Sequence, residues 1–156
     1  MPTLKSIVYS PDDGTPDPAD HYFRVPLAQA ALTVEGGIHG DRKGRHPDRQ
    51  LNVMGTPALA ELAAQGYQTG PGQMGEQLVL DGLDVDALAP GDRVQIGAAV
   101  IELVKARSGC ERFEHIQTLP RAGTRLGYMA RVAVAGDIRV GDAVAVVRQA
   151  EAAAAD

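Results

Sequence analysis

The chain has 156 residues, of which 44% are hydrophobic, and a formal net charge of −5. This length suits one domain with a hydrophobic core, and the composition is not that of a disordered chain. The acidic balance argues against nonspecific nucleic-acid binding, and no apolar run reaches the roughly 18 residues that a membrane span needs. We therefore expect a single domain over residues 1–148 that binds neither nucleic acid nor membrane.

Cysteine occurs once, at Cys110. A lone thiol forms no disulfide within the chain and cannot make a cysteine-only metal site, and a reducing compartment suits it. The N-terminus has no basic segment followed by a long apolar run, so no signal peptide is predicted. These features lead us to expect a cytoplasmic location.

Glycine and proline are abundant and aromatic residues are scarce: there are 18 glycines, 10 prolines and 4% aromatic residues. This composition favours short strands joined by turns over long helices. A first strand is predicted at Thr3–Ser10. Pro11–Pro18 is predicted to be a mobile loop, because it holds three prolines and three aspartates. Phe23–Leu27 and Ala31–Glu35 are expected to be short strands or connectors.

A helix is predicted after a strand at Leu51–Met54. Thr56 is the candidate N-cap, Pro57 would occupy the first helical position and Gly66 would end the helix. Later segments are expected to alternate strands with turns: strands at Gln77–Leu80, Arg93–Ile96, Ala99–Val104, Met129–Ala135 and Ala143–Val147, and a turn at Gly136–Asp137. We therefore expect a mainly β fold with a few helices, a closed or nearly closed β-barrel, followed by an alanine-rich tail at residues 149–156.

The surroundings of Cys110 suit a reactive thiol. Ser108 and Glu111 have the spacing of a capping box, which would place Cys110 in the first turn of a helix. There the helix dipole and the free backbone N–H groups favour a thiolate, and Arg107 and Arg112 add positive charge. A thiolate can bind a metal or carry sulfur. The alternative is a buried, inert cysteine that only fills space.

A cluster of basic residues stands out in this acidic chain. Five potentially cationic side chains fall within eight residues, after a glycine-rich turn: Arg42, Lys43, Arg45, His46 and Arg49. Arginine and lysine side chains next to glycine backbone can hold a phosphate group. The alternative is a solvated surface loop. Asp41, which precedes the cluster, is expected to bond backbone N–H groups in its own turn.

A second glycine-rich segment runs from Gly72 to Gln77. Its glycines, Gly75 among them, would shape the backbone at the edge of a cleft, where Glu76 and Gln77 offer polar contacts. The alternative is a plain turn before a strand. The histidines lack the spacing of a zinc site, so no zinc is expected.

Taken in order, these segments resemble the MOSC family, the C-terminal domain of molybdenum cofactor sulfurases. The similarity covers about residues 35–147, in the segments Gly36–Asp41, Arg49–Leu51, Pro71–Leu78, Asp81–Asp84, Leu88–Gly97, Gly127–Val132 and Gly136–Asp142. Cys110 falls where the family keeps its cysteine. Gln77 stands where the family usually has asparagine, and Ser108-Gly109 precedes the cysteine where many members have proline.

The resemblance implies a β-barrel related to the pyruvate-kinase barrel domain. It also implies that Cys110 ligates the molybdenum of a bound molybdenum cofactor (molybdopterin), in a protein that reduces N-hydroxylated substrates with external electron-transfer proteins. Further residues are then expected to bind this pterin cofactor. The basic loop would contact its phosphate through Arg42, Lys43, Arg45 and Arg49, and the remaining cofactor-binding residues would be Gly75, Glu76, Gln77 and Arg112. Arg112 is expected to lower the pKa of the thiol or to touch the ligand.

The family implies a second role for the cysteine. Cys110 would carry sulfur as a persulfide, received from a pyridoxal-phosphate-dependent cysteine desulfurase and delivered to a metal–sulfur centre. Pyridoxal phosphate would belong to that partner, because Lys5, Lys43 and Lys105 stand in no recognisable Schiff-base motif. A third hypothesis is a cofactor-binding module without catalysis. The sequence leaves open whether the protein is an enzyme.

Overall fold

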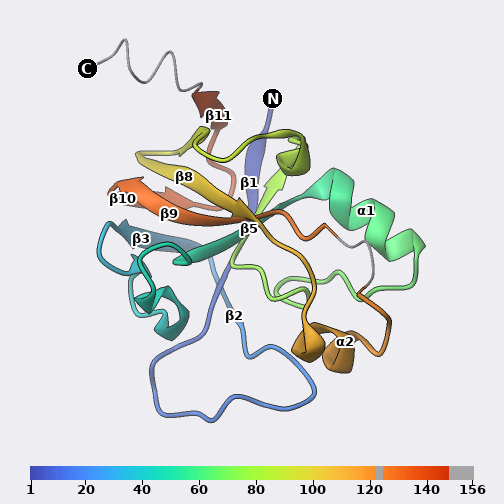
Figure 1. The fold of residues 1–156 in the computed structure, drawn as a ribbon. Helices are drawn as coiled ribbons and strands as arrows, with labels where there is room; N and C mark the ends of the chain where they lie inside the picture. Colours follow the sequence, from blue (N-terminus) through green and yellow to red (C-terminus); the bar gives the residue numbers. More distant parts are fainter. Residues whose placement is uncertain (122–124, 148–156) are drawn as a thin grey trace.

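The computed structural model describes residues 1–121 and 125–147, and the alanine-rich tail expected at residues 149–156 lies outside them. Strands dominate, and the two α-helices described, α1 (Thr56–Ala64) and α2 (Glu111–Gln117), are short (Figure 1). Two 3₁₀-helices complete the elements, η1 (Arg42–Arg45) and η2 (Val85–Ala87). The expectation of a mainly β fold with a few helices is confirmed.

The strands form two sheets. The larger sheet has eight strands: β1 (Thr3–Tyr9), β2 (Val25–Leu27), β5 (Leu51–Gly55), β6 (Leu78–Asp81), β7 (Arg93–Ile96), β8 (Ala99–Ala106), β9 (Tyr128–Val134) and β11 (Val144–Val147). Its order is β11-β7-β8-β9-β5-β6-β1-β2, with β5 and β6 parallel and the other pairs antiparallel. The smaller sheet has the order β10-β3-β4, formed by β3 (Gln29–Thr33), β4 (Gly37–Ile38) and β10 (Gly136–Arg139).

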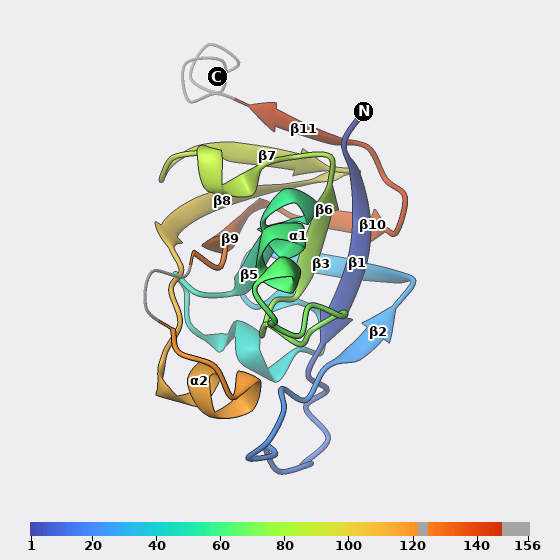
Figure 2. The ribbon, with the colours of Figure 1, turned by 90° about the vertical axis from the view of Figure 1, so that its right-hand side faces the viewer.

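The larger sheet is not closed into a barrel, although its two ends come close together. Beside the first residues of β1 lies the turn before β11: Leu4 N donates to Asp142 O at 2.9 Å and Val144 N donates to Pro2 O at 3.0 Å. Figure 2 shows the N-terminal end of β1 next to β11. Among the described residues, the pairing between β1 and the chain at the start of β11 is limited to these bonds and to an isolated bridge between Thr3 and Ala143. Of the expected closed or nearly closed barrel, full closure is therefore wrong.

Two apolar clusters hold the molecule together. The main core lies between the sheets and includes fully buried residues from β1, β5, β6, β7 and β8, such as Leu4, Leu51 and Ile101. A smaller cluster joins both helices to the loops: Met54, Leu62, Met74, Phe113 and Leu126. Because Phe113 is fully buried there and its ring lies 5.7 Å from that of Tyr67, α2 has a fixed position at one end of the molecule.

Both predicted N-caps are wrong. α1 begins at Thr56 itself, with Gly55 as N-cap, because the Thr56 hydroxyl instead donates to Asp81 Oδ1 at 3.0 Å and accepts from Gly82 N at 3.2 Å. Ser108 does not cap α2, whose N-cap is Cys110. In each case the local spacing is compatible with capping, but the backbone adopts another solution.

The turn predicted at Gly136–Asp137 is also wrong, since these residues begin β10. β10 pairs with β3, Asp137 opposite Ala31 and Ile138 opposite Ala30. The Ile138 side chain is fully buried in the main core. Burial of that side chain and the ladder hydrogen bonds outweigh the turn preference of glycine and aspartate.

Candidate functional site

Cys110 is exposed and lies directly before α2. Its carbonyl oxygen accepts a hydrogen bond from Glu114 N at 3.0 Å, while its thiol makes no capping bond. The thiol is therefore accessible rather than packed in the core, which contradicts the hypothesis of a buried, inert cysteine. It is the N-cap residue and not, as predicted, a residue of the first helical turn.

Arg107 is a buried arginine close to Cys110. It follows β8, and its Nη1 donates to Met74 O at 2.8 Å. Burial lowers the pKa of Arg107, whereas the nearby Tyr22, Glu76 and Cys110 oppose that change. Buried guanidinium groups need anions or carbonyl oxygens as partners, so Arg107 brings positive charge and donor groups to the neighbourhood of the thiol.

Tyr22 lies between two further arginines. The guanidinium carbons of Arg24 and Arg112 lie 5.5 and 5.2 Å from the centre of its ring, within the range of cation–π interactions. Burial raises the pKa of Tyr22, and Cys110 acts in the same direction. We call the group of Arg24, Arg107 and Arg112 around Tyr22 the arginine cluster.

The arginine cluster contains two buried donors without acceptors. Arg24 Nη1 and Nη2 bond to Phe23 O and Gly75 O at 3.0 and 3.1 Å. Arg24 Nε is buried and has no hydrogen-bond partner among the described residues, and the buried Tyr22 hydroxyl has none of ordinary geometry there, although it interacts with Arg107. Buried unpaired donors are rare and costly, and they mark a place where an acceptor-bearing ligand or water would be stabilised.

Gly75 allows the arginine cluster to approach the backbone. Its φ is +83°, and a Cβ atom there would lie 2.6 Å from Arg107 Nη2 and 3.0 Å from Tyr22 Cζ. No larger residue fits without displacing these groups. This agrees with the prediction that glycines of this segment shape the backbone.

Glu76 and Gln77 are buried supports of this segment. Glu76 is 0% exposed and accepts hydrogen bonds from Gly72 N at 2.7 Å and Met74 N at 3.1 Å. Burial raises the pKa of Glu76, and the backbone bonds and Arg107 oppose that shift. Gln77 accepts from Asn52 N at 2.7 Å. Neither carboxylate nor amide reaches the surface, so direct ligand contact by either would require the segment to move.

Asp41 has the structural role that its position suggested. Its Oδ1 accepts from Ser10 N at 3.1 Å and from Lys43 N at 3.2 Å, while its Oδ2 accepts from the Gln77 amide at 3.3 Å. The carboxylate thus joins β1, η1 and the residue before β6. This network holds the basic segment in place.

Asp17 brings two of the predicted phosphate-binding residues, Arg42 and Lys43, together with Arg112. Its carboxylate contacts Arg42 Nη2 at 2.9 Å, Lys43 Nζ at 2.7 Å and Arg112 Nη1 at 3.6 Å. The hydrogen bond from Lys43 is the main reason that the pKa of Asp17 is lowered. A place where three cations surround one carboxylate can also hold another oxyanion.

The other two predicted phosphate-binding residues lie apart from this point. Arg45 Nη2 pairs with Asp12 Oδ2 at 2.5 Å and is largely exposed. The Arg49 side chain is exposed, with no hydrogen bond or ion pair in the described part of the chain. The acidic loop of residues 11–18 thus lies against the basic segment and α2, at the lower end of the molecule in both views (Figures 1 and 2).

Three residues of this region were not predicted from the sequence: Tyr22, Arg24 and the buried Gln117. Gln117 connects α2 to the segment before β6: its amide donates to Gln68 O at 2.9 Å and Gln73 O at 3.0 Å, and its Oε1 accepts from Gln68 N at 2.7 Å. These residues follow no motif or periodic pattern. Their importance depends on contacts across more than 40 residues, for which a single sequence carries no signal.

Three surface cavities, of about 550, 640 and 310 Å³, lie elsewhere, and none is lined by Cys110 or by the arginine cluster. Within residues 1–121 and 125–147, no three histidine, cysteine, aspartate or glutamate residues gather in a way that could hold a metal ion. Among the described helices, none has the length and hydropathy to cross a membrane. Among the described residues, Cys110 therefore has no group of further histidine, cysteine, aspartate or glutamate side chains beside it that could complete a metal site.

Comparisons with known proteins give a consistent result. A family model described as the MOSC domain matches residues 37–145. The crystal structure of YiiM from Geobacillus stearothermophilus is similar with a TM-score of 0.72 at 21% identity, covering 96% of this chain and 76% of that chain. YUAD protein from Bacillus subtilis has a TM-score of 0.73 at 17% identity, covering 94% and 96%. YiiM from Escherichia coli has a TM-score of 0.66 at 22% identity, covering 96% and 71%. No curated protein matches the chain. At these identities the structural neighbours show a shared fold.

Proposed function

The chain belongs to the MOSC domain family, and on that premise we propose that it binds molybdenum cofactor, with the thiolate of Cys110 as a ligand of the metal. The observation that carries the proposal is the exposed residue Cys110 near an arginine cluster that includes the buried Arg107 and has unpaired buried atoms. A ligand with many acceptor atoms and a soft metal suits both features.

The residues fit a pterin cofactor with a phosphate group. The Tyr22 hydroxyl and Arg24 Nε are buried donors in need of acceptors. The carboxylate of Asp17 occupies the point where Arg42, Lys43 and Arg112 meet, which is where a phosphate would be held. We therefore assign phosphate binding first to these three cations, and a lesser, outer contribution to Arg45 and Arg49.

The remaining residues position these groups. Glu76 holds the segment of residues 72–76 through its two backbone bonds, and Gly75 leaves the space that Arg107 needs. Arg107 and Arg112 place positive charge near the sulfur. A bound cofactor would supply the redox centre for reduction of N-hydroxylated substrates, with electrons from external electron-transfer proteins in the cytoplasm.

The second candidate function is sulfur transfer, and the exposure of Cys110 favours it. A persulfide carrier needs a thiol that a cysteine desulfurase can reach, since the Cys110 thiolate would attack the outer sulfur of a persulfide on that enzyme and release the enzyme's thiolate. The pyridoxal phosphate would belong to that desulfurase. A module that binds cofactor without catalysis is the third candidate, in which Cys110 is retained without turnover.

Molybdenum content tests the first function. Purified protein is incubated anaerobically with freshly released molybdenum cofactor, gel-filtered and assayed for molybdenum per chain. We expect near-stoichiometric metal in the wild type and in Ser108→Ala, an exposed neighbour without a capping role, and a fall to background in Cys110→Ala.

The same preparations separate the alternatives. Equal molybdenum content in wild type and Cys110→Ala would show that Cys110 is not a ligand of the metal. It would favour the third candidate, a module that binds the cofactor without catalysis. Absence of molybdenum in all three proteins would sink the cofactor proposal. Intact mass after incubation with a cysteine desulfurase and cysteine would then detect the sulfur atom that a carrier adds to Cys110.

A further inference from the structure

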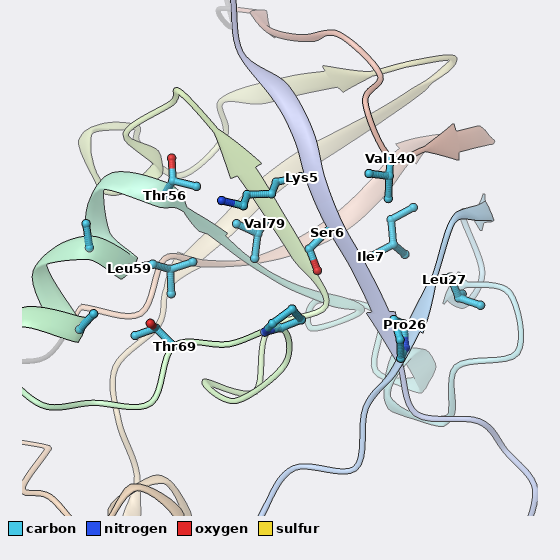
Figure 3. Close-up of a pocket in the computed structure, with 13 residues that line it drawn as sticks. Lys5, Ser6, Ile7, Pro26, Leu27, Thr56, Leu59, Thr69, Val79 and Val140 are labelled. Carbon is cyan, nitrogen blue, oxygen red and sulfur yellow. The ribbon is translucent and has the colours of Figure 1, made fainter.

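One of the three cavities lies between β1, the end of β2, β6 and α1 (Figure 3). Its volume is about 550 Å³, which is in the range of small-molecule sites. Most of its lining is apolar, and the lining includes Ile7, Leu27, Leu59, Val79 and Val140. None of the residues of the arginine cluster lines it. We call it the α1 cavity.

An irregularity of β1 makes a cationic side chain, that of Lys5, part of the lining of the α1 cavity. The pairing of β1 with β6 shifts between Leu4 and Ser6, so Lys5 is the extra residue of a β-bulge. A bulge re-aims side chains, and here Lys5 and Ser6, although successive in the strand, both line the cavity. Figure 3 shows the Lys5 side chain extending from β1 toward α1, near Val79.

Lys5 has no carboxylate partner in the described part of the chain: none of the ion pairs there includes it. Asp81 of β6, which pairs with Thr3 in the ladder, accepts instead from the Thr56 hydroxyl at 3.0 Å. The ammonium group is thus available to an anion that enters the cavity.

The helix leaves room for a ligand body. Ala60 and Ala63, one turn apart on α1, line the cavity and are exposed, and Leu59 beside them is half-buried. Exposed apolar surface arranged in a concave site gains free energy when an apolar group covers it. The lining therefore suits a molecule that has both an anionic group, for Lys5, and an apolar body, for the rest of the cavity.

We propose that the α1 cavity binds a small amphipathic carboxylate, a molecule with an apolar chain or ring and a single carboxylate group. The apolar body packs against Leu27, Leu59 and Val79, and the carboxylate accepts hydrogen bonds from the ammonium group of Lys5. This site is independent of Cys110 and of the proposed cofactor, and the chain needs neither for the interaction.

Octanoate is the probe, and octan-1-ol, which has the same chain length without the charge, is the matched ligand control. Both are titrated into ¹⁵N-labelled protein and followed by amide chemical shifts. We expect octanoate to move the amides of residues 5–7, 56–63 and 69–71 and to bind several times more tightly than octan-1-ol. Absence of shifts at these residues would overturn the proposal.

Two substitutions test whether the charge of Lys5 contributes to octanoate binding. Lys5→Met keeps the length of the side chain but removes its charge, and is expected to weaken octanoate roughly fivefold while leaving octan-1-ol unchanged. Lys105→Met, at an exposed lysine of β8, should change neither. Equal affinity of octanoate for wild type and Lys5→Met would overturn the assignment of a carboxylate.

Ala60→Leu fills the cavity and keeps a good helix former at an exposed position, so the variant is expected to fold. We expect it to weaken octanoate and octan-1-ol alike, by about tenfold. Wild-type affinity in Ala60→Leu would place the ligand elsewhere and overturn the proposal.

Discussion

The segment of residues 69–76 has two sides that are built by different means. Toward Cys110 it presents carbonyl groups, with Met74 O accepting from Arg107 and Gly75 O accepting from Arg24. On the other side, Thr69 and Pro71 form part of the wall of the α1 cavity. The first side depends on bonds of defined distance and angle, and the second on contact area. Small backbone changes should therefore damage the arginine cluster far more than the cavity.

Of the substitutions considered, Gly75→Ala should destabilise the protein most, and it should do so on the side of the arginine cluster. Two causes of destabilisation add in this variant: alanine is strained at a φ of +83°, and its Cβ would lie 2.6 Å from Arg107 Nη2. We expect the free energy of unfolding, measured by urea denaturation, to fall by about 2 to 3 kcal/mol. Octanoate binding at the α1 cavity should be retained under conditions in which the variant is folded.

A matched control separates the clash from the backbone strain. Gly14 has nearly the same φ, +84°, but a Cβ there would meet nothing within 4 Å. Gly14→Ala should therefore lose only about 1 kcal/mol. Equal losses in the two variants would show that crowding around Arg107 is not what restricts Gly75 to glycine.

Glu76→Gln tests whether the shared segment supports both sides. The amide can accept one of the two backbone N–H bonds but presents an NH₂ group to the other, so we expect a loss of about 1 to 2 kcal/mol in urea denaturation. Because the segment also forms a wall of the α1 cavity, octanoate binding should weaken as well.

The pH dependence of this variant has a definite sign. Burial raises the pKa of Glu76, so the carboxyl group contributes stability that is fully present below its unfolded pKa and is lost as the pH rises through the raised folded pKa. Wild type should therefore exceed Glu76→Gln in stability by more at pH 4 than at pH 8. A difference that grows toward pH 8 would contradict the direction of the pKa shift.

Asp17→Asn should have the smallest effect of these substitutions. It should change anion binding by Arg42, Lys43 and Arg112 and leave the α1 cavity unaffected. Removing the carboxylate frees Arg42, Lys43 and Arg112 from their common partner. We expect pyrophosphate, titrated calorimetrically at low salt, to bind severalfold more tightly, since each half-exposed ion pair is worth about 0.2 to 1 kcal/mol. Asp13→Asn is the control, since Asp13 forms no ion pair with a basic residue in the described chain. Unchanged affinity in Asp17→Asn would remove this point as the phosphate position.

Sequence patterns predicted local features well and distant ones poorly. The strand at residues 3–9, the helix after β5 and the role of Asp41 in its turn follow from alternation, proline position and side-chain chemistry within a few residues. The N-cap at Thr56 was predicted wrongly because the hydroxyl bonds to Asp81, 25 positions later. The same spacing is compatible with both outcomes, and only the position of β6 decides between them.

The expected mobile loop at Pro11–Pro18 shows the same limit. Its composition correctly excluded a long helix or strand, but it could not show that Asp12 and Asp17 would pair with Arg45 and with the cations around Lys43. Nor could it show that Tyr22 and Arg24, just beyond the loop, would be partly buried near Arg107. Opposite charges attract wherever the fold brings them together, so pairing is a property of the fold.

By itself, the sequence determined the family, the mainly β fold and the presence of a single cysteine flanked by arginines, because alternation, turn residues and ordered motifs are properties of short segments. Tertiary structure alone decided that Cys110 is exposed and that buried donors without acceptors lie near it. It also decided that a β-bulge directs the Lys5 side chain toward a largely apolar cavity. Burial and pairing depend on which distant segments meet in space, and a local pattern does not specify that meeting.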